Sequence, residues 1–261
     1  MKFKNIEEYY NKFNENRRLK SRHGQVEFNI SMRYLLKYLK QYDNPKIIDV
    51  GAGTGRYSIE LDKLGYDVTA VELIKHNLDV LHATNPKIKA VQANALDLSM
   101  FESNSFDVTI LFGPMYHLFN YEDKLRALNE VKRITKNGGL IFVAYCLNDY
   151  SIITYAFVEN HIKEVIKNRK LTSDFITKTS EEDLYSYDTL ETINKLKEAS
   201  DLKREIIFSP DGPTDYIRKT VNDMDEETFK IYLNYIEKIS SKPELIGAGS
   251  HIVDVLRKKI K

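Results

Sequence analysis

The stretch KIIDVGAGTGRYSIELDKLGYDVTAVEL, residues 46–73, decides the fold. An apolar run leads into three closely spaced glycines, a helical pattern follows, and a second apolar run ends the stretch. A strand that feeds a glycine turn and then a helix places backbone N–H groups and the positive end of the helix dipole at the edge of a sheet. The sequence therefore predicts a ligand site at the carboxyl edge of a sheet.

The glycines are Gly51, Gly53 and Gly55, in the spacing G-x-G-x-G. Arg56 stands where the dinucleotide fingerprint G-x-G-x-x-G has its last glycine, which counts against a nicotinamide or flavin cofactor without excluding one. Glu72 ends the next apolar run, where a carboxylate can accept both hydroxyls of an adenosine ribose. The alternative is a surface glutamate with no ligand. These features favour an adenosine cofactor and leave its identity open.

Between residues 46 and 146, short β-branched or apolar runs alternate with helical patterns. Strand runs that are apolar nearly throughout, separated by helices, predict a parallel sheet covered on both faces. Four segments follow from this alternation: an N-terminal helical lid or cap, a ligand-binding core, a helical insertion that is a candidate substrate cover, and a part that completes the sheet with a C-terminal helix and strand. Their expected ranges are 1–45, 46–146, 147–204 and 205–261.

Composition limits the function classes. The chain has 261 residues, 42% of them hydrophobic and 30% charged, with a formal net charge of +1. This is a soluble globular composition without a bulk field for a polyanionic partner. Cys146 is the single cysteine, so no intrachain disulfide can form, and no histidine spacing suggests a metal. Without a signal-like or membrane-spanning apolar run, a cytoplasmic protein with no membrane association is expected.

The core resembles the class I S-adenosylmethionine-dependent methyltransferases. IIDVGAGTG is similar to their first motif, VTAVEL to the acidic end of their second strand, and VQANALDLSMFESNSFDVTILFG to their third and fourth strands. ALNEVKRITKNGGLIFVAY is similar to their next helix, turn and fifth strand. The resemblance covers about residues 45–146. It implies an α/β fold with a Rossmann-like, doubly wound, mostly parallel seven-stranded sheet whose last strand is antiparallel, with a helical insertion after strand 5.

The resemblance also implies a set of cofactor-binding residues for S-adenosyl-L-methionine and its product S-adenosyl-L-homocysteine. Asp49 would orient the glycine loop, directly or through water, while Glu72 would bind the ribose and Leu73 would pack on the adenine. Asn94 falls where many members have an aspartate that bonds the adenine amino group. The complete expected set is Asp49, Gly51, Ala52, Gly53, Gly55, Glu72, Leu73, Asn94, Ala95, Leu96, Phe112, Gly113, Tyr10 and Arg18.

The segment LFGPMYHLF follows the fourth strand, where the methyl group is expected. It lacks the Asn- or Asp-Pro-Pro-aromatic motif of amino-methylating nucleic-acid enzymes and the Pro-Cys of cytosine C5 enzymes, and it resembles a bacterial subgroup with a GPxYHL-like segment. The Gly113-Pro114 turn would present Met115, Tyr116 and His117. The predicted catalytic residues are His117, as a general base, and Tyr116, which would orient the acceptor; alternatively, both only wall the site.

The ends of the chain carry two further interpretations. In EYYNKFNENRRL, Tyr10 or Arg18 would reach the cofactor carboxylate if residues 1–29 fold over the site, as similar segments do in the resembling subgroup; a solvated amphipathic helix explains the same residues. His251 resembles a Ser-His element of that subgroup's last strand. Without a partner in the local sequence, His251 is interpreted as structural.

The predicted function is methyl transfer to an unidentified small molecule by a monomer or homodimer. One alternative is an RNA methyltransferase, which near-zero net charge and the lack of an added RNA-binding module oppose. Another is a non-catalytic protein that binds S-adenosylmethionine or a nucleoside. The sequence names neither the acceptor nor the atom that is methylated.

Overall fold

The computed structural model describes residues 21–260, and seven strands within this range form one sheet. Their order across the sheet is β3-β2-β1-β4-β5-β7-β6, and β7 alone runs antiparallel to its neighbours. This confirms the predicted seven-stranded sheet with an antiparallel last strand. The strands are β1 (Lys46–Val50), β2 (Asp67–Glu72), β3 (Lys89–Gln92), β4 (Phe106–Leu111), β5 (Thr135–Cys146), β6 (Leu202–Phe208) and β7 (His251–Lys258).

The central strands are apolar on both faces because helices cover both. Along β1, Ile47 packs into the core on one face, while Ile48 and Val50 pack into the core on the other. Residues that alternate along a strand point to opposite faces, so a strand between two helical layers needs apolar residues at nearly every position. This explains why the central runs lack the polar alternation of a strand with one solvated face.

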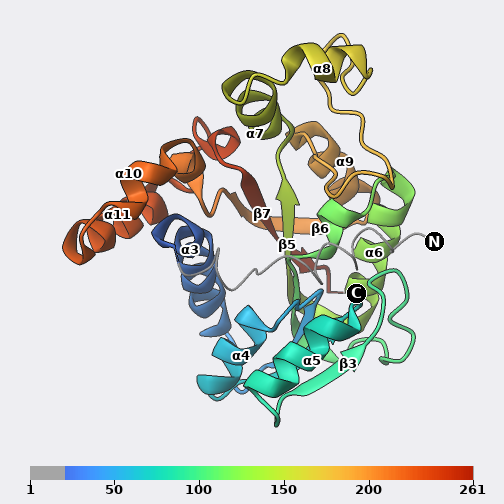
Figure 1. The fold of residues 1–261 in the computed structure, drawn as a ribbon. Coiled ribbons are helices and arrows are strands. Elements are labelled where there is room, and N and C mark those ends of the chain that lie inside the picture. Colours follow the sequence, from blue (N-terminus) through green and yellow to red (C-terminus); the bar gives the residue numbers. More distant parts are fainter. Residues whose placement is uncertain (1–20, 261) are drawn as a thin grey trace.

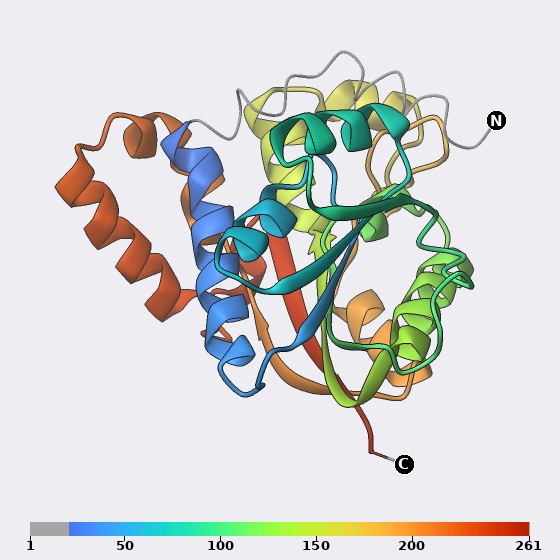
Figure 2. The same ribbon diagram turned by 90° about the horizontal axis from the view of Figure 1, so that it is seen from below.

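Two helical layers enclose the sheet (Figure 1). Helices α3 (Arg22–Leu39), α4 (Arg56–Lys63) and α5 (Lys75–Thr84) lie on one face, and α10 (Arg218–Asn222) and α11 (Glu226–Ile239) pack beside α3. Helices α6 (Tyr121–Ile134) and α9 (Leu190–Ala199) cover the other face. Figure 2 shows α3 and α11 on the opposite side of the sheet from α6.

The chain between β5 and α9 departs from the strand–helix alternation. It contains α7 (Asn148–Ser151), the π-helix η2 (Ile152–Val158) and α8 (Ile162–Lys167), followed by an extended loop to α9. Figure 1 shows α7 and α8 beyond the carboxyl end of β5. The expected end of this insertion at residue 204 lies inside β6, which begins at Leu202, and α9 packs on α6 as part of the core. The insertion proper therefore ends before Leu190.

A buried ion pair fixes the returning end of the insertion to the core. The Lys124 Nζ of α6 lies 2.5 Å from Asp188 Oδ2, with both side chains about 5% exposed or less. The backbone N–H of Asp188 also donates to the Cys146 carbonyl at the end of β5. A buried charge without its partner is costly, so this pair specifies one position for the loop. The loop residues just before Asp188 are thereby held against the sheet edge.

Within residues 21–260, no helix combines the length and the apolar composition that crossing a bilayer requires.

Candidate functional site

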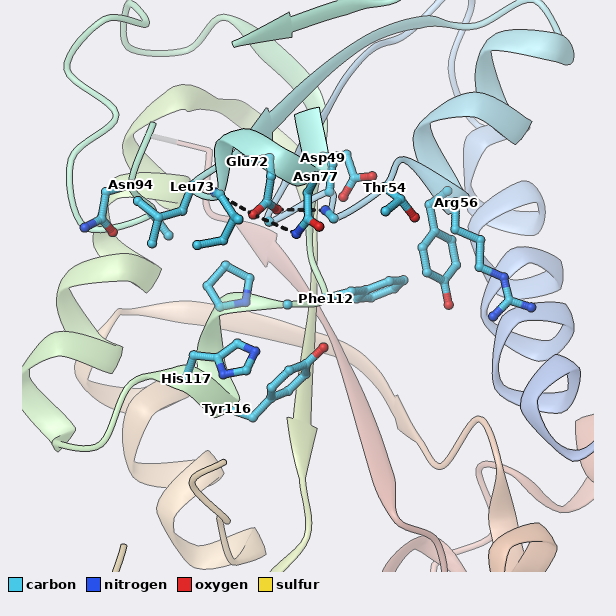
Figure 3. A pocket seen from close by; sticks show the side chains of 18 of the residues that line it. Asp49, Thr54, Arg56, Glu72, Leu73, Asn77, Asn94, Phe112, Tyr116 and His117 are labelled. Atoms are coloured by element: carbon cyan, nitrogen blue, oxygen red, sulfur yellow. Dashed lines mark hydrogen bonds between the residues drawn. The ribbon is translucent and has the colours of Figure 1, made fainter. Parts of the chain in front are cut away.

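A cavity opens at the carboxyl edge of the sheet, above the ends of β1, β2 and β4. Its walls come from the glycine loop, the end of β2, the segment after β3, and the 3₁₀ turn η1 (Pro114–His117). Figure 3 shows Glu72 and Asn77 facing Tyr116 and His117 across it.

The glycine loop is held by the end of β2. The N–H groups of Gly51 and Ala52 donate to the Val71 carbonyl at 2.7 and 2.9 Å, and Gly53 N donates to Glu72 Oε2 at 2.8 Å. Gly51 and Gly53 have φ of 80° and 57°, a region that side chains other than glycine adopt rarely. A Cβ added to Gly53 would meet no atom within 4 Å, so this residue faces the open cavity. The loop is built for close approach of a ligand.

Glu72 is the best-held polar group of the cavity. Besides Gly53, it accepts from Ile74 N at 2.9 Å and from Asn77 Nδ2 at 3.4 Å through Oε1. Burial raises the pKa of Glu72, and the hydrogen bonds from the Ile74 and Gly53 backbone oppose that rise. A carboxylate has about four lone-pair positions, so the bonds from Gly53, Ile74 and Asn77 leave about one position of Glu72 for a hydroxyl group of a ligand.

Asp49 lies buried beneath the loop and lines the bottom of the cavity. The Ser58 hydroxyl donates to its Oδ2 at 2.6 Å, so Asp49 is tied to the first turns of α4. The loop N–H groups described above bond to Val71 and Glu72 instead. Burial raises the pKa of Asp49 to about 6, and the bond from Ser58 only partly offsets this.

Asp49→Asn is expected to flatten the pH dependence of stability. The folded pKa of Asp49 is raised, so the stability that its protonated form contributes is lost as pH rises through about 6. Relative to wild type, the variant should gain on the order of 1–3 kcal/mol between about pH 4 and about pH 7.5. Urea unfolding at both pH values measures this. The exposed Asp79→Asn is the control, and equal pH slopes for Asp49→Asn and wild type would contradict the prediction.

Two predicted cofactor residues do not line the cavity. Gly55 begins α4, and a Cβ there would come within 2.8 Å of the Leu81 side chain on α5, so its role is close helix packing. Leu96 lines a separate surface hollow with Asp97 and packs against the core on the α6 face. Both residues belong to the expected motifs, but neither lines the cavity.

The GPMYH segment lies directly against the glycine loop. A Cβ on Gly51 would come within 2.4 Å of Pro114 Cδ, and a Cβ on Gly113 would come within 2.8 Å of the Gly51 carbonyl oxygen. The two turns therefore interlock, and each requires the other's glycine. Met115, which the sequence was expected to present beside Tyr116 and His117, is instead fully buried in the core.

Tyr116 and His117 line the cavity, and the insertion packs on both. The Tyr185 ring lies 5.8 Å from the Tyr116 ring and 5.4 Å from the His117 ring, centroid to centroid. His117 Nδ1 is 3.0 Å from the Leu184 carbonyl oxygen, so in the neutral ring this nitrogen carries the hydrogen. Burial lowers the pKa of His117 to about 4, more than the Leu184 contact raises it. His117 is therefore neutral, and a weak base, at neutral pH.

Residues that were predicted to lie beside the adenine also line the cavity. Leu73, Asn94 and Ala95 line the cavity, and the Asn94 Oδ1 accepts from Leu96 N at 3.0 Å, which shapes the loop after β3. Ala52, Phe112 and Gly113 also line it, as predicted. Tyr10 and Arg18, the predicted contacts from an N-terminal lid, lie outside the described residues.

Several lining residues were missed by sequence reasoning. Asn77 sits one helical turn into α5 and bonds Glu72, a pairing that the spacing after an acidic strand end could have suggested. Glu27 comes from α3, and no local motif marks it. The other missed residues are Thr54, Arg56, Tyr57, Ile74, Ala93, Pro114 and Leu118.

Residues 48–143 match the family model described as a methyltransferase domain. An uncharacterised methyltransferase of Mycobacterium tuberculosis is 34% identical over 104 residues, which are 40% of this chain and 41% of that protein. The demethylmenaquinone methyltransferase of Renibacterium salmoninarum is 39% identical over 100 residues, 38% of this chain and 40% of that protein. The chain thus aligns with about two fifths of the length of these curated relatives.

Solved structures match over nearly the whole chain. One described as a possible histamine N-methyltransferase, from Thermotoga maritima, has a TM-score of 0.59 at 16% identity and covers 96% of this chain and 98% of its own. At that identity the similarity concerns the fold. The chain therefore shares its fold with a solved structure that is described as an S-adenosylmethionine-dependent methyltransferase.

Proposed function

We propose that this chain is a class I S-adenosylmethionine-dependent methyltransferase that transfers a methyl group to a small-molecule acceptor. The observation that carries the proposal is the joint position of Gly53 and Glu72. The first leaves open space where a Cβ would project, and the second is a buried carboxylate on the same cavity. Together they fit a ligand that has a chain close to Gly53 and a ribose beside Glu72.

The lining residues fit S-adenosylmethionine in order along the cavity. Glu72 would accept a ribose hydroxyl, Leu73 and Ala95 would flank the adenine, and the glycine loop would hold the methionine part. Asn94 has its carbonyl oxygen engaged by Leu96, so its amide group is the part left to meet the adenine edge. Bound S-adenosylmethionine supplies an electrophilic methyl group on a sulfonium, and the protein then aligns an acceptor and excludes water.

The segment after β4 is proposed as the acceptor side. Tyr116 and His117 face the cavity, and the insertion covers them through Tyr185. The lowered pKa of His117, about 4, makes its neutral ring a weak base, which favours a role in orienting an acceptor over a role as the principal base. A site covered in this way favours a small acceptor. The formal net charge of +1 gives no general support to an RNA acceptor.

Calorimetry with S-adenosylmethionine, S-adenosylhomocysteine and a nicotinamide dinucleotide tests the cofactor. We expect binding of the first two and none of the third. A screen of small acceptors that bear amine, hydroxyl or thiol groups, monitored by release of S-adenosylhomocysteine, then tests the activity. Binding without turnover of any acceptor would favour the alternative of a non-catalytic binding protein. Transfer to bulk RNA with a steep salt dependence, and to no small acceptor, would favour the RNA methyltransferase.

A further inference from the structure

His251, interpreted from sequence as structural, begins β7 and pairs with Cys146, the last residue of β5. Since β7 runs antiparallel to the other strands, its first residue lies at the carboxyl edge, where the cofactor cavity opens. The fold thus places an imidazole at the edge that carries the glycine loop. The His251 side chain is 20% exposed.

Asp211 holds this imidazole in one orientation. His251 Nδ1 lies 2.7 Å from Asp211 Oδ2, and the Asp211 carboxylate also accepts from the hydroxyls of Ser209 and Ser250. A Cβ on Gly249 would come within 2.4 Å of Asp211 Oδ1, so the turn before β7 is shaped around this carboxylate. A carboxylate that fixes one imidazole nitrogen directs the other nitrogen toward a substrate.

Glu27 links this pair to the cofactor cavity. It lines the cavity from α3, and its Oε2 lies 4.0 Å from His251 Nδ1. Its side chain is 24% exposed, so neither Glu27 nor His251 is sealed in the core. Glu27 therefore lies both on the cavity wall and beside the imidazole.

The surroundings of His251 are rich in ionisable groups. Burial alone would lower the pKa of His251, but Glu27, Cys146 and the hydrogen bond to Asp211 raise it well above the usual value. Collecting such groups costs stability and is a common feature of functional sites. Among the described residues, no such cluster is arranged to hold a metal ion. The titratable and charged groups that face His251 are Glu27, Cys146, Tyr150, Tyr187, Asp211, Asp215 and Arg218.

We propose that His251, oriented by Asp211 and faced by Glu27, accepts the proton that the methyl acceptor releases. The inference rests on the proposed function and makes the acceptor a proton-bearing nitrogen or oxygen nucleophile. The acceptor lone pair forms the bond to the methyl carbon as the carbon–sulfur bond breaks and leaves its electron pair on sulfur. The acceptor proton passes to the His251 imidazole, and the resulting imidazolium is stabilised by Asp211 and Glu27 before water takes the proton.

This role predicts a pH profile that His117 would not give. His251 must be neutral to accept a proton, and its pKa is raised, so kcat/KM should increase as pH rises through a value above about 6.5. Glu27→Gln removes a negative charge, lowers the pKa of His251, and should move the rising limb to lower pH. A base with the pKa of His117, about 4, would leave the profile flat across neutral pH.

The first measurement needs no acceptor. Titration of the histidine rings of the full chain by NMR, with the His251 signal assigned by its loss in His251→Asn, should give an apparent pKa above about 6.5 that falls in Glu27→Gln and in Asp211→Asn. A pKa at or below the ordinary value, or one indifferent to both variants, overturns the proposal. Failure of the proposed function would be seen separately, as absence of S-adenosylmethionine binding in calorimetry.

The kinetic measurement uses phenethylamine and 4-methylphenol as proton-bearing probes and iodide as a probe without a proton. His251→Asn should slow transfer to the first two by about 100-fold or more, leave transfer to iodide unchanged, and bind S-adenosylmethionine within about threefold of wild type. Added imidazole should restore part of the rate. The exposed His82→Asn is the control. Equal loss with iodide, or unchanged turnover of the proton-bearing probes, would show that His251 is only structural.

Discussion

Glu72→Ala is expected to weaken S-adenosylmethionine binding by about 10- to 100-fold, because a charge-assisted bond to a ribose hydroxyl, about 1.5–3 kcal/mol, is lost. The substitution also removes the acceptor of Gly53 N and Ile74 N, which lie 2.8 and 2.9 Å from the carboxylate. The glycine loop would then lose one of its attachments to β2. Calorimetry with S-adenosylmethionine measures the loss.

The effect on stability should be much smaller than the effect on binding. Burial raises the pKa of Glu72, so removal of the carboxylate relieves a desolvation cost while it leaves donors unpaired. Glu72→Gln keeps one acceptor oxygen and should bind with an intermediate affinity. Glu60→Ala, on the solvent side of α4 with a side chain 43% exposed, serves as the control in binding and thermal unfolding. Binding by Glu72→Ala within about threefold of wild type would mean that the ribose lies elsewhere.

The fold was predictable because its signals are local. Each central strand is buried on both faces, so Ile47, Ile48 and Val50 form a nearly continuous apolar run in the sequence although they pack on opposite faces of the sheet. The positions of Gly53 and Glu72 were predictable for the same reason, since each ends a strand or follows one directly. The antiparallel direction of β7 came from the resemblance to a family, because strand direction leaves little trace in composition.

The predictions that differ from the structure depend on where side chains point. Gly55 has the spacing of a ligand-binding glycine, yet Leu81 of α5 occupies the place that its Cβ would take. Met115 follows a turn that exposes its neighbours, but its own side chain is buried among the α6-side core residues. A motif fixes which residues occur in a turn, and the packing of distant elements decides which of them face the ligand.

His251 and Glu27 show the limit of local reasoning most clearly. The contact between them joins α3 to β7, two elements at opposite ends of the described chain, and Asp211 reaches the same imidazole from the turn after β6. No spacing in the sequence links these three residues. They meet because α3 packs across the sheet face and β7 is inserted between β5 and β6. The role proposed for His251 therefore had to be argued from the structure.

Gly51→Ala is expected mainly to lower stability, and Gly53→Ala mainly to weaken S-adenosylmethionine binding, although both glycines belong to the same loop. An alanine at position 51 would adopt a φ of 80° and place its Cβ 2.4 Å from Pro114 Cδ, and the rigid proline ring cannot rotate away. Left-handed strain of about 1–2 kcal/mol and overpacking of about 1–3 kcal/mol should together cost about 2–5 kcal/mol of unfolding free energy.

An alanine at position 53 would have the left-handed backbone strain but no steric clash. An alanine there would adopt a φ of 57° with no atom within 4 Å of its Cβ, so the expected loss of stability is about 1–2 kcal/mol. Its Cβ would instead project into the space proposed for the methionine part of the cofactor, and binding should weaken by about tenfold or more. Urea unfolding without ligand and calorimetry with S-adenosylmethionine separate the two effects. If Gly53→Ala lost as much stability as Gly51→Ala, the contact between the glycine loop and the Pro114 turn would not be what fixes the loop. If Gly53→Ala bound S-adenosylmethionine as wild type does, the methionine part would lie away from Gly53.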